Sequence, residues 1–377
     1  VAMHCALSAL GREVGESLAP LQVGVGTSSG VEAVAHAVAT ALTTDPENVL
    51  LTIDMENAFN TLDRGEMLAA VRQHVPQMLP VMQWAYGEAT TLHVLGAPPG
   101  TTIESQRGTK QGNVEAGLLF ALTLHKPLQA AAEAAPDAAT VAYYDDISVV
   151  GKPAALRDAF QRLCGTGAEG VGSVGLRVRP SKCSVHGGIA AQCATLATDI
   201  DVQHCPDGVV VVGVPVGSEA FKTAHLAHRA DAVVRLVDTL TALPLAMQSK
   251  WLILRSSLAW RMAHLERTVD WDLLSTSTRR VERAILAAAA AIFRLPPPPP
   301  DAPLALSLEL RQLSLALRHG GFGLRATSAL QAAAAYLSGA AAAQLVMDDG
   351  PLTFRPFNGP NAPALRALWH RVHDEFA

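Results

Sequence analysis

The spacing of apolar and polar residues divides the chain into helical and extended segments. Residues 30–42 repeat apolar positions with helical spacing, and the run VLLTID that follows predicts a strand ending at Asp54. In the segment TVAYYDDISVV, residues 140–150, two short apolar arms flank Asp145 and Asp146 and predict a strand on each side of them. The pattern also predicts helices at 64–86, 114–135 and 154–164, the first interrupted near Pro76 and Pro80, and a hairpin around 96–100.

The order of these elements indicates an α+β fold, with an antiparallel sheet and helices, followed by a part that is entirely helical. We expect the first region at 1–220, where strands and helices mix, and a second at 221–295, where only the helical period remains. The third, 296–377, starts with a five-proline run that favours a stiff extended spacer and continues into an alanine-rich helix.

Composition and charge narrow the class of protein. The chain has 377 residues, 49% of them hydrophobic and 17% charged, so it can bury a large core. Its net charge of −5 does not indicate a nucleic-acid-binding protein as a whole. Residues 221–283, however, contain ten basic and six acidic side chains, a net charge of +4. This segment fits either a surface that binds phosphates or an ordinary solvated helix face.

Several observations concern where the protein acts. No uncharged apolar span approaches 20 residues, and the N-terminus has no signal-peptide pattern or other targeting signal. Five cysteines without a Cys-x-x-Cys pair favour a reducing compartment. We therefore expect a soluble intracellular protein without a membrane partner, and leave its oligomeric state open. Because it begins with Val1, we also expect a fragment of a longer chain.

Three acidic residues are candidates for a shared site. Asp54, Asp145 and Asp146 each follow or precede a predicted strand, and a small antiparallel sheet can bring them together. Crowded carboxylates repel one another and are tolerated chiefly where divalent cations neutralise them. Hard oxygen ligands suit Mg²⁺, and two such ions suit nucleotidyl transfer.

Five motifs occur in the order expected for one family of polymerases. They are LLTIDMENAFN, RGTKQGNVEAGLLFALTL, AYYDDISVVG, GLRVRPSKC and VVVVGVPVG, and together they span residues 50–217. With these motifs the chain resembles the reverse transcriptases of non-LTR (LINE-type) retrotransposons. The resemblance implies a right-hand polymerase fold, with partial fingers and palm in 1–220 and a thumb in 221–295. It implies RNA-directed DNA polymerase activity with an RNA template, a DNA primer and dNTPs as partners, and the nucleus as a location.

The resemblance also implies roles for individual residues. Asp54 and Asp145 match the ligands of two Mg²⁺ ions, or of Mn²⁺ in their place, and Asp146 matches an accessory acid of the same cluster. Phe59 matches the bulky ring that excludes a ribose 2′-hydroxyl. The other matches are Arg107, Gln111 and Gly112 in the nucleotide-binding loop, Lys182 beside the leaving pyrophosphate, and Gly213, Val214, Pro215 and Gly217 in the primer grip.

The second motif departs from the family pattern. An acidic residue and two prolines are expected after Gln111 and Gly112, whereas this chain continues with Asn113-Val-Glu-Ala-Gly117. Loss of the prolines predicts a looser loop, and Glu115 adds a negative charge that would weaken triphosphate binding. The basic fingers hairpin of the family has no counterpart before LQVGVGTSSG, and no endonuclease or zinc-knuckle segment is seen. These departures leave open whether this copy is active.

Other interpretations of the same residues remain open. Phe59 also suits a packed core, Lys182 a solvated turn, and Gln111 with Gly112 a plain helix start. Asp63 and Arg64 favour a helix start over chemistry.

Two further function classes fit part of the sequence. A dinucleotide-binding enzyme would use Gly24, Gly26 and Gly30 with Asp54, although the glycine spacing is one residue too long. A polymerase relative that binds nucleic acid without catalysis would explain the motif losses.

Overall fold

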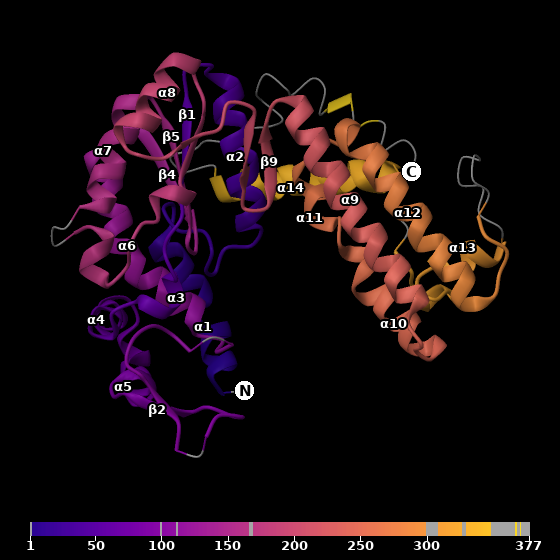
Figure 1. Ribbon diagram of the computed structural model, residues 1–377, viewed down its shortest axis with the longest axis horizontal. Coiled ribbons are helices and arrows are strands. Elements are labelled where there is room, and N and C mark those ends of the chain that lie inside the picture. Colours follow the sequence, from indigo (N-terminus) through magenta and orange to yellow (C-terminus); the bar gives the residue numbers. More distant parts are fainter. Residues whose placement is uncertain are drawn as a thin grey trace. The chain divides into compact units, whose positions relative to one another are not determined.

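The computed structural model describes residues 2–98, 100–110, 112–165, 169–298, 308–325, 329–347, 366–367 and 370. The chain forms two compact units. The first comprises Val1–Gly213 with Ala342–Arg355, and the second Val214–Ala341 with Pro356–Ala377. The first unit combines a sheet with helices, and the second is mainly helical, so the expected α+β fold class is confirmed (Figure 1).

A five-stranded sheet in the order β4-β5-β1-β6-β7 forms the centre of the first unit. Each neighbouring pair is antiparallel except β6 with β7, which is parallel. The strands are β1 (Val49–Ile53), β4 (Ala138–Tyr143), β5 (Asp146–Gly151), β6 (Ser184–Gly187) and β7 (Gln203–His204). The helices of this unit are α1 (Ala2–Leu18), α2 (Gly30–Thr44), α3 (Ala58–Thr61), α4 (Arg64–His74), α5 (Leu79–Tyr86), α6 (Ala116–Ala134), α7 (Pro153–Cys164) and α8 (Ala190–Asp199), with the 3-10 turns η1 (Pro76–Met78), η2 (Val171–Val174) and η3 (Pro180–Lys182).

Strand β1 is the central strand and is antiparallel to both of its neighbours. Four of its five residues are buried, which explains why its sequence is a continuous apolar run and not an alternating one. A dinucleotide-binding fold would need this strand to be parallel to its neighbours in a doubly wound sheet. The pairing of β1 therefore contradicts the dinucleotide-binding interpretation of Gly24, Gly26, Gly30 and Asp54.

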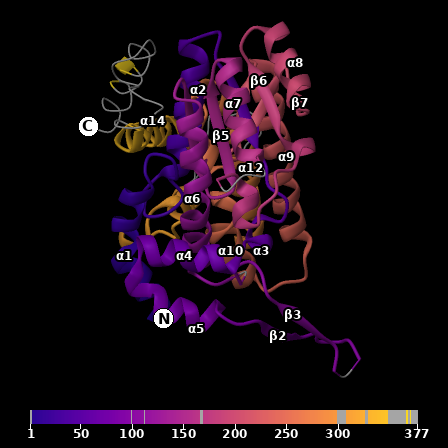
Figure 2. The ribbon, with the colours of Figure 1, turned by 90° about the vertical axis from the view of Figure 1, so that its left-hand side faces the viewer.

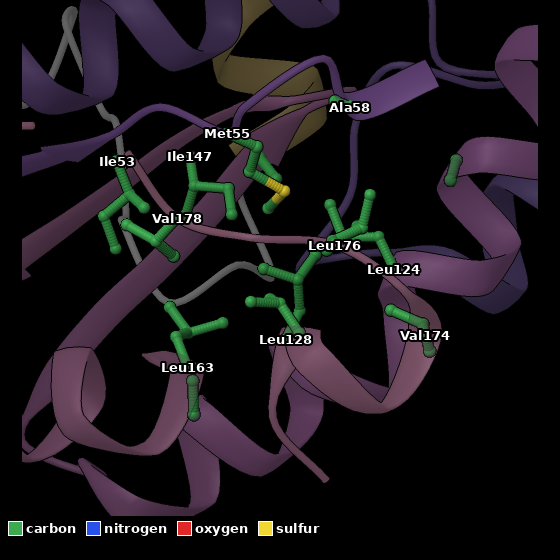
Figure 3. Packing of buried hydrophobic residues seen from close by; sticks show 14 of the residues in the cluster. Ile53, Met55, Ala58, Leu124, Leu128, Ile147, Leu163, Val174, Leu176 and Val178 are labelled. Carbon is green, nitrogen blue, oxygen red and sulfur yellow. The ribbon is translucent and has the colours of Figure 1, made fainter. Parts of the chain in front are cut away.

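The hydrophobic core connects the sheet with the helices that cover it. Figure 3 shows Ile53 of β1, Ile147 of β5 and Val178 gathered on one face, with Leu124 and Leu128 of α6 nearby. All five side chains are buried and belong to one cluster. Because Ile53 and Ile147 are also partners in the β1–β5 ladder, the same packing that forms the core fixes the register of the two strands.

The helical segment predicted at 64–86 consists of α4, η1 and α5, and the two prolines have different effects. The helix breaks before Pro76, as predicted. Pro80 lies in the first turn of α5, which begins at Leu79, where a missing N–H costs no hydrogen bond, so the interruption predicted near the two prolines is confirmed. Asp63 caps α4 by accepting hydrogen bonds from Gly65 N (2.8 Å) and Glu66 N (3.1 Å), which confirms the predicted helix start.

Two hairpins accompany the main sheet. β2 (Thr90–His93) and β3 (Thr102–Ser105) pair antiparallel, which confirms the hairpin predicted around 96–100. Figure 2 shows this hairpin extending away from α4 and α5. β8 (Gly208–Val211) and β9 (Val214–Gly217) form a separate two-stranded sheet, and the division between the two units falls in the turn that joins them.

The second unit contains β9 and then helices. They are α9 (Glu219–Ala242), α10 (Met247–Ser256), α11 (Ala263–Thr268), α12 (Trp271–Phe293), α13 (Leu308–Ser314) and α14 (Ala329–Met347, which crosses into the first unit), with the 3-10 turns η4 (Leu258–Trp260) and η5 (Leu317–His319). The expected change to helices is thus confirmed.

Pro296, Pro297 and Pro298 are irregular, and the rest of the proline run lies outside the described residues. The expected division at 220 and 295 stays a prediction. No helix in the described ranges has the length and apolarity that crossing a bilayer requires.

Candidate active site

The register of the central sheet places the three candidate acids at one edge. Ile53 of β1 is paired with Ile147 of β5, so Asp54 follows the pair on one strand and Asp146 precedes it on the other. Asp145 lies in the turn that joins β4 to β5, where Tyr143 is paired with Asp146. Residues 91 positions apart in the sequence are thus brought together by strand pairing.

The electrostatics of the three carboxylates are consistent with this proximity. Burial raises the pKa of Asp145 above its ordinary value, a hydrogen bond from its own backbone opposes the rise, and the negative charge of Asp54 adds to it. For Asp146, burial raises the pKa most, followed by the charges of Asp145 and Asp54. Each proton is therefore held more tightly than in an isolated aspartate. Ionisation of all three carboxylates together is unfavourable unless a cation balances their charges.

Lys182 joins two of these acids around a small cavity. The cavity measures about 130 Å³ and is lined by Asp54, Asp146 and Lys182, together with Thr52, Ile53, Ile147, Ser148, Val210, Val211 and Val212. Lys182 ends the turn η3, and the segment around it is tied to Asp54 through the main chain. The Asp54 N–H donates to Cys183 Sγ (3.4 Å), and the Asp54 carbonyl accepts from Arg179 N (2.9 Å). The structure therefore groups a cationic side chain with the predicted acids.

The oxygen atoms of Asp54, Asp145 and Asp146 determine which metal the site fits. No group of three or more His, Cys, Asp and Glu side chains in the described part of the chain could hold a metal ion by itself. Mg²⁺ commonly binds through one or two carboxylates, with waters and substrate phosphates as its other ligands. The mutual repulsion of Asp54, Asp145 and Asp146 fits such a partial site, which a substrate would complete.

A buried amide that sequence reasoning missed holds the aspartate turn. Tyr144, directly before Asp145, has a φ of 53°, which is unfavourable for a residue other than glycine. Gln22, 0% exposed, accepts from Tyr144 N (2.8 Å) and donates to the Tyr144 carbonyl (3.1 Å). Both backbone groups of the strained residue are therefore satisfied by one side chain. Gln22 lies in the stretch LQVGVGTSSG, and no pattern there identifies a residue whose partner is 122 positions away.

Phe59 lies next to this turn. Its ring stacks on Phe120 of α6 with centroids 4.5 Å apart and lies 6.5 Å from the ring of Tyr144. Gly117 of α6 makes room for Tyr144, because a Cβ there would come within 2.8 Å of Tyr144 Cε1. Phe59 is half-buried, so it contributes to the core and also remains partly exposed.

Side-chain contacts connect the residues directly before α6 to the end of α5. Glu115, 4% exposed, accepts hydrogen bonds from Tyr86 Oη (3.1 Å) and Asn113 Nδ2 (2.7 Å). Tyr86 is itself buried, with Arg64 Cζ and Lys110 Nζ each 5.4 Å from its ring centroid. The charge of Glu115, expected to weaken triphosphate binding, is therefore buried in contact with Tyr86 and Asn113. These contacts brace the loop that lacks the family's prolines.

The other residues expected to bind nucleotide differ in how they are placed. Gly112 has a φ of 89°, a conformation that glycine adopts without strain. Arg107 has an exposed side chain, and its carbonyl accepts from Arg64 Nη2 (3.3 Å). Gln111 lies outside the described residues. The nucleotide-binding role of all three stays a prediction.

The residues expected to form the primer grip are on the β8–β9 hairpin. Val212 and Gly213 form its two-residue turn, and both have a positive φ, 44° and 84°. Val214 and Pro215 follow in β9 and are buried, and Gly217 ends the strand. Gly213 belongs to the first unit, and Val214, Pro215 and Gly217 belong to the second, so their role in holding a primer stays a prediction.

Comparisons with known proteins found one matching family and similar solved structures. The sequence profile of the family described as reverse transcriptase (RNA-dependent DNA polymerase) matches residues 2–205. No match was found among curated proteins. Among solved structures, apo telomerase from Candida tropicalis is similar with a TM-score of 0.49 and 8% identity, covering 99% of this chain and 58% of that chain. Telomerase from Candida albicans, in complex with the TWJ fragment of telomeric RNA, has a TM-score of 0.44 and 11% identity, covering 96% and 55%. This chain spans little more than half the length of either telomerase chain.

The family match includes the central sheet and every residue around the carboxylates except those of the β8–β9 hairpin. It extends over more than half of the 377 residues. The chain therefore belongs to the reverse transcriptase (RNA-dependent DNA polymerase) family.

Proposed function

We propose that this chain adds deoxynucleotides to the 3′-hydroxyl of a DNA primer on an RNA template. The observation that carries the proposal is the meeting of Asp54, Asp145 and Asp146 at one edge of the sheet, with their charges coupled. An acidic site with Lys182 on the same cavity suits the transfer of a charged nucleotidyl group.

The carboxylates would hold divalent ions, with Asp54 and Asp145 as ligands and Asp146 as an accessory acid. Two Mg²⁺ ions, or Mn²⁺ in their place, supply Lewis acidity to the attacking hydroxyl and the leaving pyrophosphate. Lys182 would neutralise or protonate that pyrophosphate as it leaves. Phe59 would lie beneath the sugar and exclude a 2′-hydroxyl. Arg107, Gln111 and Gly112 would contact the nucleotide, and Gly213, Val214, Pro215 and Gly217 the primer end.

The order of the five motifs supports an origin in a non-LTR retrotransposon, which would also account for a nuclear location. A polymerase relative that binds nucleic acid without catalysis is the second candidate. It is favoured by Asn113, Glu115 and Gly117, which differ from the family pattern. The contacts of Glu115 favour the active alternative, because they tie Tyr86 and Asn113 to the start of α6 where the prolines are missing.

The experiment that tests the proposal is primer extension by the purified chain on an RNA template with Mg²⁺ and dNTPs. Asp145→Asn keeps the shape of the side chain and removes its charge, so we expect incorporation to fall by on the order of 10²–10³. Asp137→Asn is the matched control, because Asp137 is exposed in the turn before β4. Equal incorporation by wild type and Asp145→Asn would contradict the catalytic assignment. Primed-template binding without extension by the wild type would support the second candidate.

A further inference from the structure

An exposed tryptophan lies beside two arginines in the second unit. Trp260, at the end of η4, is 55% exposed. It lines a cavity of about 520 Å³ with Arg255 at the end of α10 and Arg318 in η5. The remaining lining residues are Ser256, Ala316, Leu317 and Gly323. The volume is within the range of sites that hold small organic groups.

The tryptophan is supported from the interior of the same unit. The guanidinium of Arg325 lies 4.8 Å from the centre of the Trp260 ring, a cation–π contact. Arg325 also donates to the carboxylate of Glu266, which is 1% exposed. The buried ion pair fixes Arg325, and Arg325 in turn fixes the indole. More than half of the tryptophan surface nevertheless remains open to a ligand.

The charges around the cavity favour an anionic ligand. Arg255 Nη1 donates to the Phe322 carbonyl (3.3 Å), and Arg318 Nε donates to His319 Nε2 (3.2 Å). These contacts hold both guanidinium groups at the cavity, and among the described residues neither group is paired with a carboxylate. The lining residues include no acid. A flat aromatic surface that lines the same cavity as two positive charges suits a ligand that has planar rings and phosphates.

We propose that this face of the second unit binds single-stranded nucleic acid. One base would stack on Trp260, and the flanking phosphates would contact Arg255 and Arg318. The site needs neither a dNTP nor a divalent ion, so it is independent of the nucleotidyl transfer proposed for the carboxylates. An apolar protein partner would instead use exposed Leu317 and would not require the arginines.

The test is fluorescence anisotropy of the full chain with labelled single strands of about 12 nucleotides, oligouridylate RNA or oligothymidylate DNA, in EDTA without dNTPs. We expect Trp260→Ala to raise the Kd roughly 5- to 150-fold, and Trp260→Phe to restore most of the affinity. Arg255→Gln and Arg318→Gln should each lower the slope of log Kd against log salt concentration by about 0.7. Equal binding of RNA and DNA, or tighter binding of RNA through its 2′-hydroxyl, would both support the proposal.

Arg12→Gln is the control for charge. Arg12 is exposed on α1 of the first unit and paired with Glu16, so its loss should leave the Kd unchanged. Circular dichroism will show whether each variant is folded, and Arg318→Gln, at an exposed position, serves if Trp260→Ala unfolds. Wild-type affinity in folded Trp260→Ala or in Arg318→Gln would overturn the proposal. So would an equal loss in Arg12→Gln and Arg318→Gln, which would indicate unspecific attraction. Asp145→Asn should bind like wild type, so loss of polymerase activity alone would not affect this result.

Discussion

The ring of Phe59 contacts both the core and the turn that carries the aspartates. It packs against Phe120 in the core, and it also lies near Tyr144, beside the turn that carries Asp145. The sequence supported both a packing role and a role in sugar selection. Partial burial of the ring is compatible with both, so the two roles must be separated by substitution.

We expect Phe59→Ala to increase the incorporation of ribonucleotides relative to deoxynucleotides by tenfold or more, because space opens for a 2′-hydroxyl. Primer extension with rNTPs and dNTPs in parallel measures the ratio. Phe120→Leu is the matched control, since it weakens the same stack but leaves the Phe59 ring in place. An unchanged ratio in Phe59→Ala, or an equal change in Phe120→Leu, would contradict the gate and leave packing as the role of Phe59.

The residues of the site differ in how well the sequence predicts them. Asp54 and Asp146 could be predicted because strand periodicity and the register of two apolar strands fix where each acid lies. Gln22 could not, since its role depends on a contact with Tyr144 across the fold. Lys182 was predicted only by resemblance to a motif, and its position on the cavity depends on the turn after Val178.

At the level of elements, side-chain hydrogen bonds in the loop before α6 stand where the family has prolines. Prolines restrict a loop by limiting its backbone conformations. Here the hydroxyl of buried Tyr86 donates to Glu115 and accepts from Lys110 N (3.3 Å) and Asn113 Nδ2 (3.4 Å). Three residues of the loop are thereby tied to the last residue of α5. Sequence patterns indicated only the loss of the prolines, because the compensating contacts join separate elements.

We expect Glu115→Ala to lower the free energy of unfolding by about 1–3 kcal/mol, because the buried Tyr86 hydroxyl loses its acceptor. The loosened loop should raise the KM for dNTPs more than it lowers kcat, and Glu115→Gln, which keeps an acceptor oxygen, should restore both. Urea unfolding and steady-state primer extension measure these effects. Glu133→Ala, exposed near the end of the same helix, is the control. A Gln variant as impaired as the Ala variant would show that charge, not the hydrogen bonds, is what matters.

The elements themselves were predicted best where a single physical signal dominated. The β2–β3 hairpin and α6 follow from their turn residues and helical spacing. The interruption near Pro76 and Pro80 follows because proline breaks a helix interior but is accepted in the first turn of the next helix. Whether Pro80 begins a new helix depends on the break at Pro76, so the two positions had to be interpreted together.

At the scale of the whole molecule, the second unit has its own source of pH dependence. Glu282 on α12 is 6% exposed, and its Oε2 has no hydrogen-bond partner among the described residues. Its pKa is raised from 4.5 to about 7, mainly by burial and also by the negative charge of Glu266, while Arg279 opposes the rise. Glu282, Glu266 and Arg325 line one small cavity of this unit. The folded state therefore binds this proton more tightly than the unfolded state does.

The sign of the effect on stability follows from linkage. The contribution of Glu282 is fully favourable below about pH 4.5 and is lost as the pH rises through about 7. We expect Glu282→Gln to match wild type near pH 4.5 and to be more stable at pH 8 by on the order of 2 kcal/mol, allowing for solvent screening. Urea unfolding at the two pH values measures the difference. Asp238→Asn, at an exposed position of α9, should show no such dependence. A constant difference across pH would disprove the assignment.

The stability of the first unit should report cation binding without any catalysis. Because the pKa values of Asp145 and Asp146 are raised above 3.8, their ionisation destabilises the folded state as the pH rises from that value. A bound cation would offset this repulsion, and at ten times its Kd it would add about 1.4 kcal/mol. We therefore expect Mg²⁺ to raise the Tm at pH 7 by about 3 °C. Asp145→Asn should have a higher Tm than wild type without Mg²⁺ and a smaller rise with it, whereas Asp137→Asn should behave like wild type. Equal rises in wild type and Asp145→Asn would show that Mg²⁺ binds elsewhere.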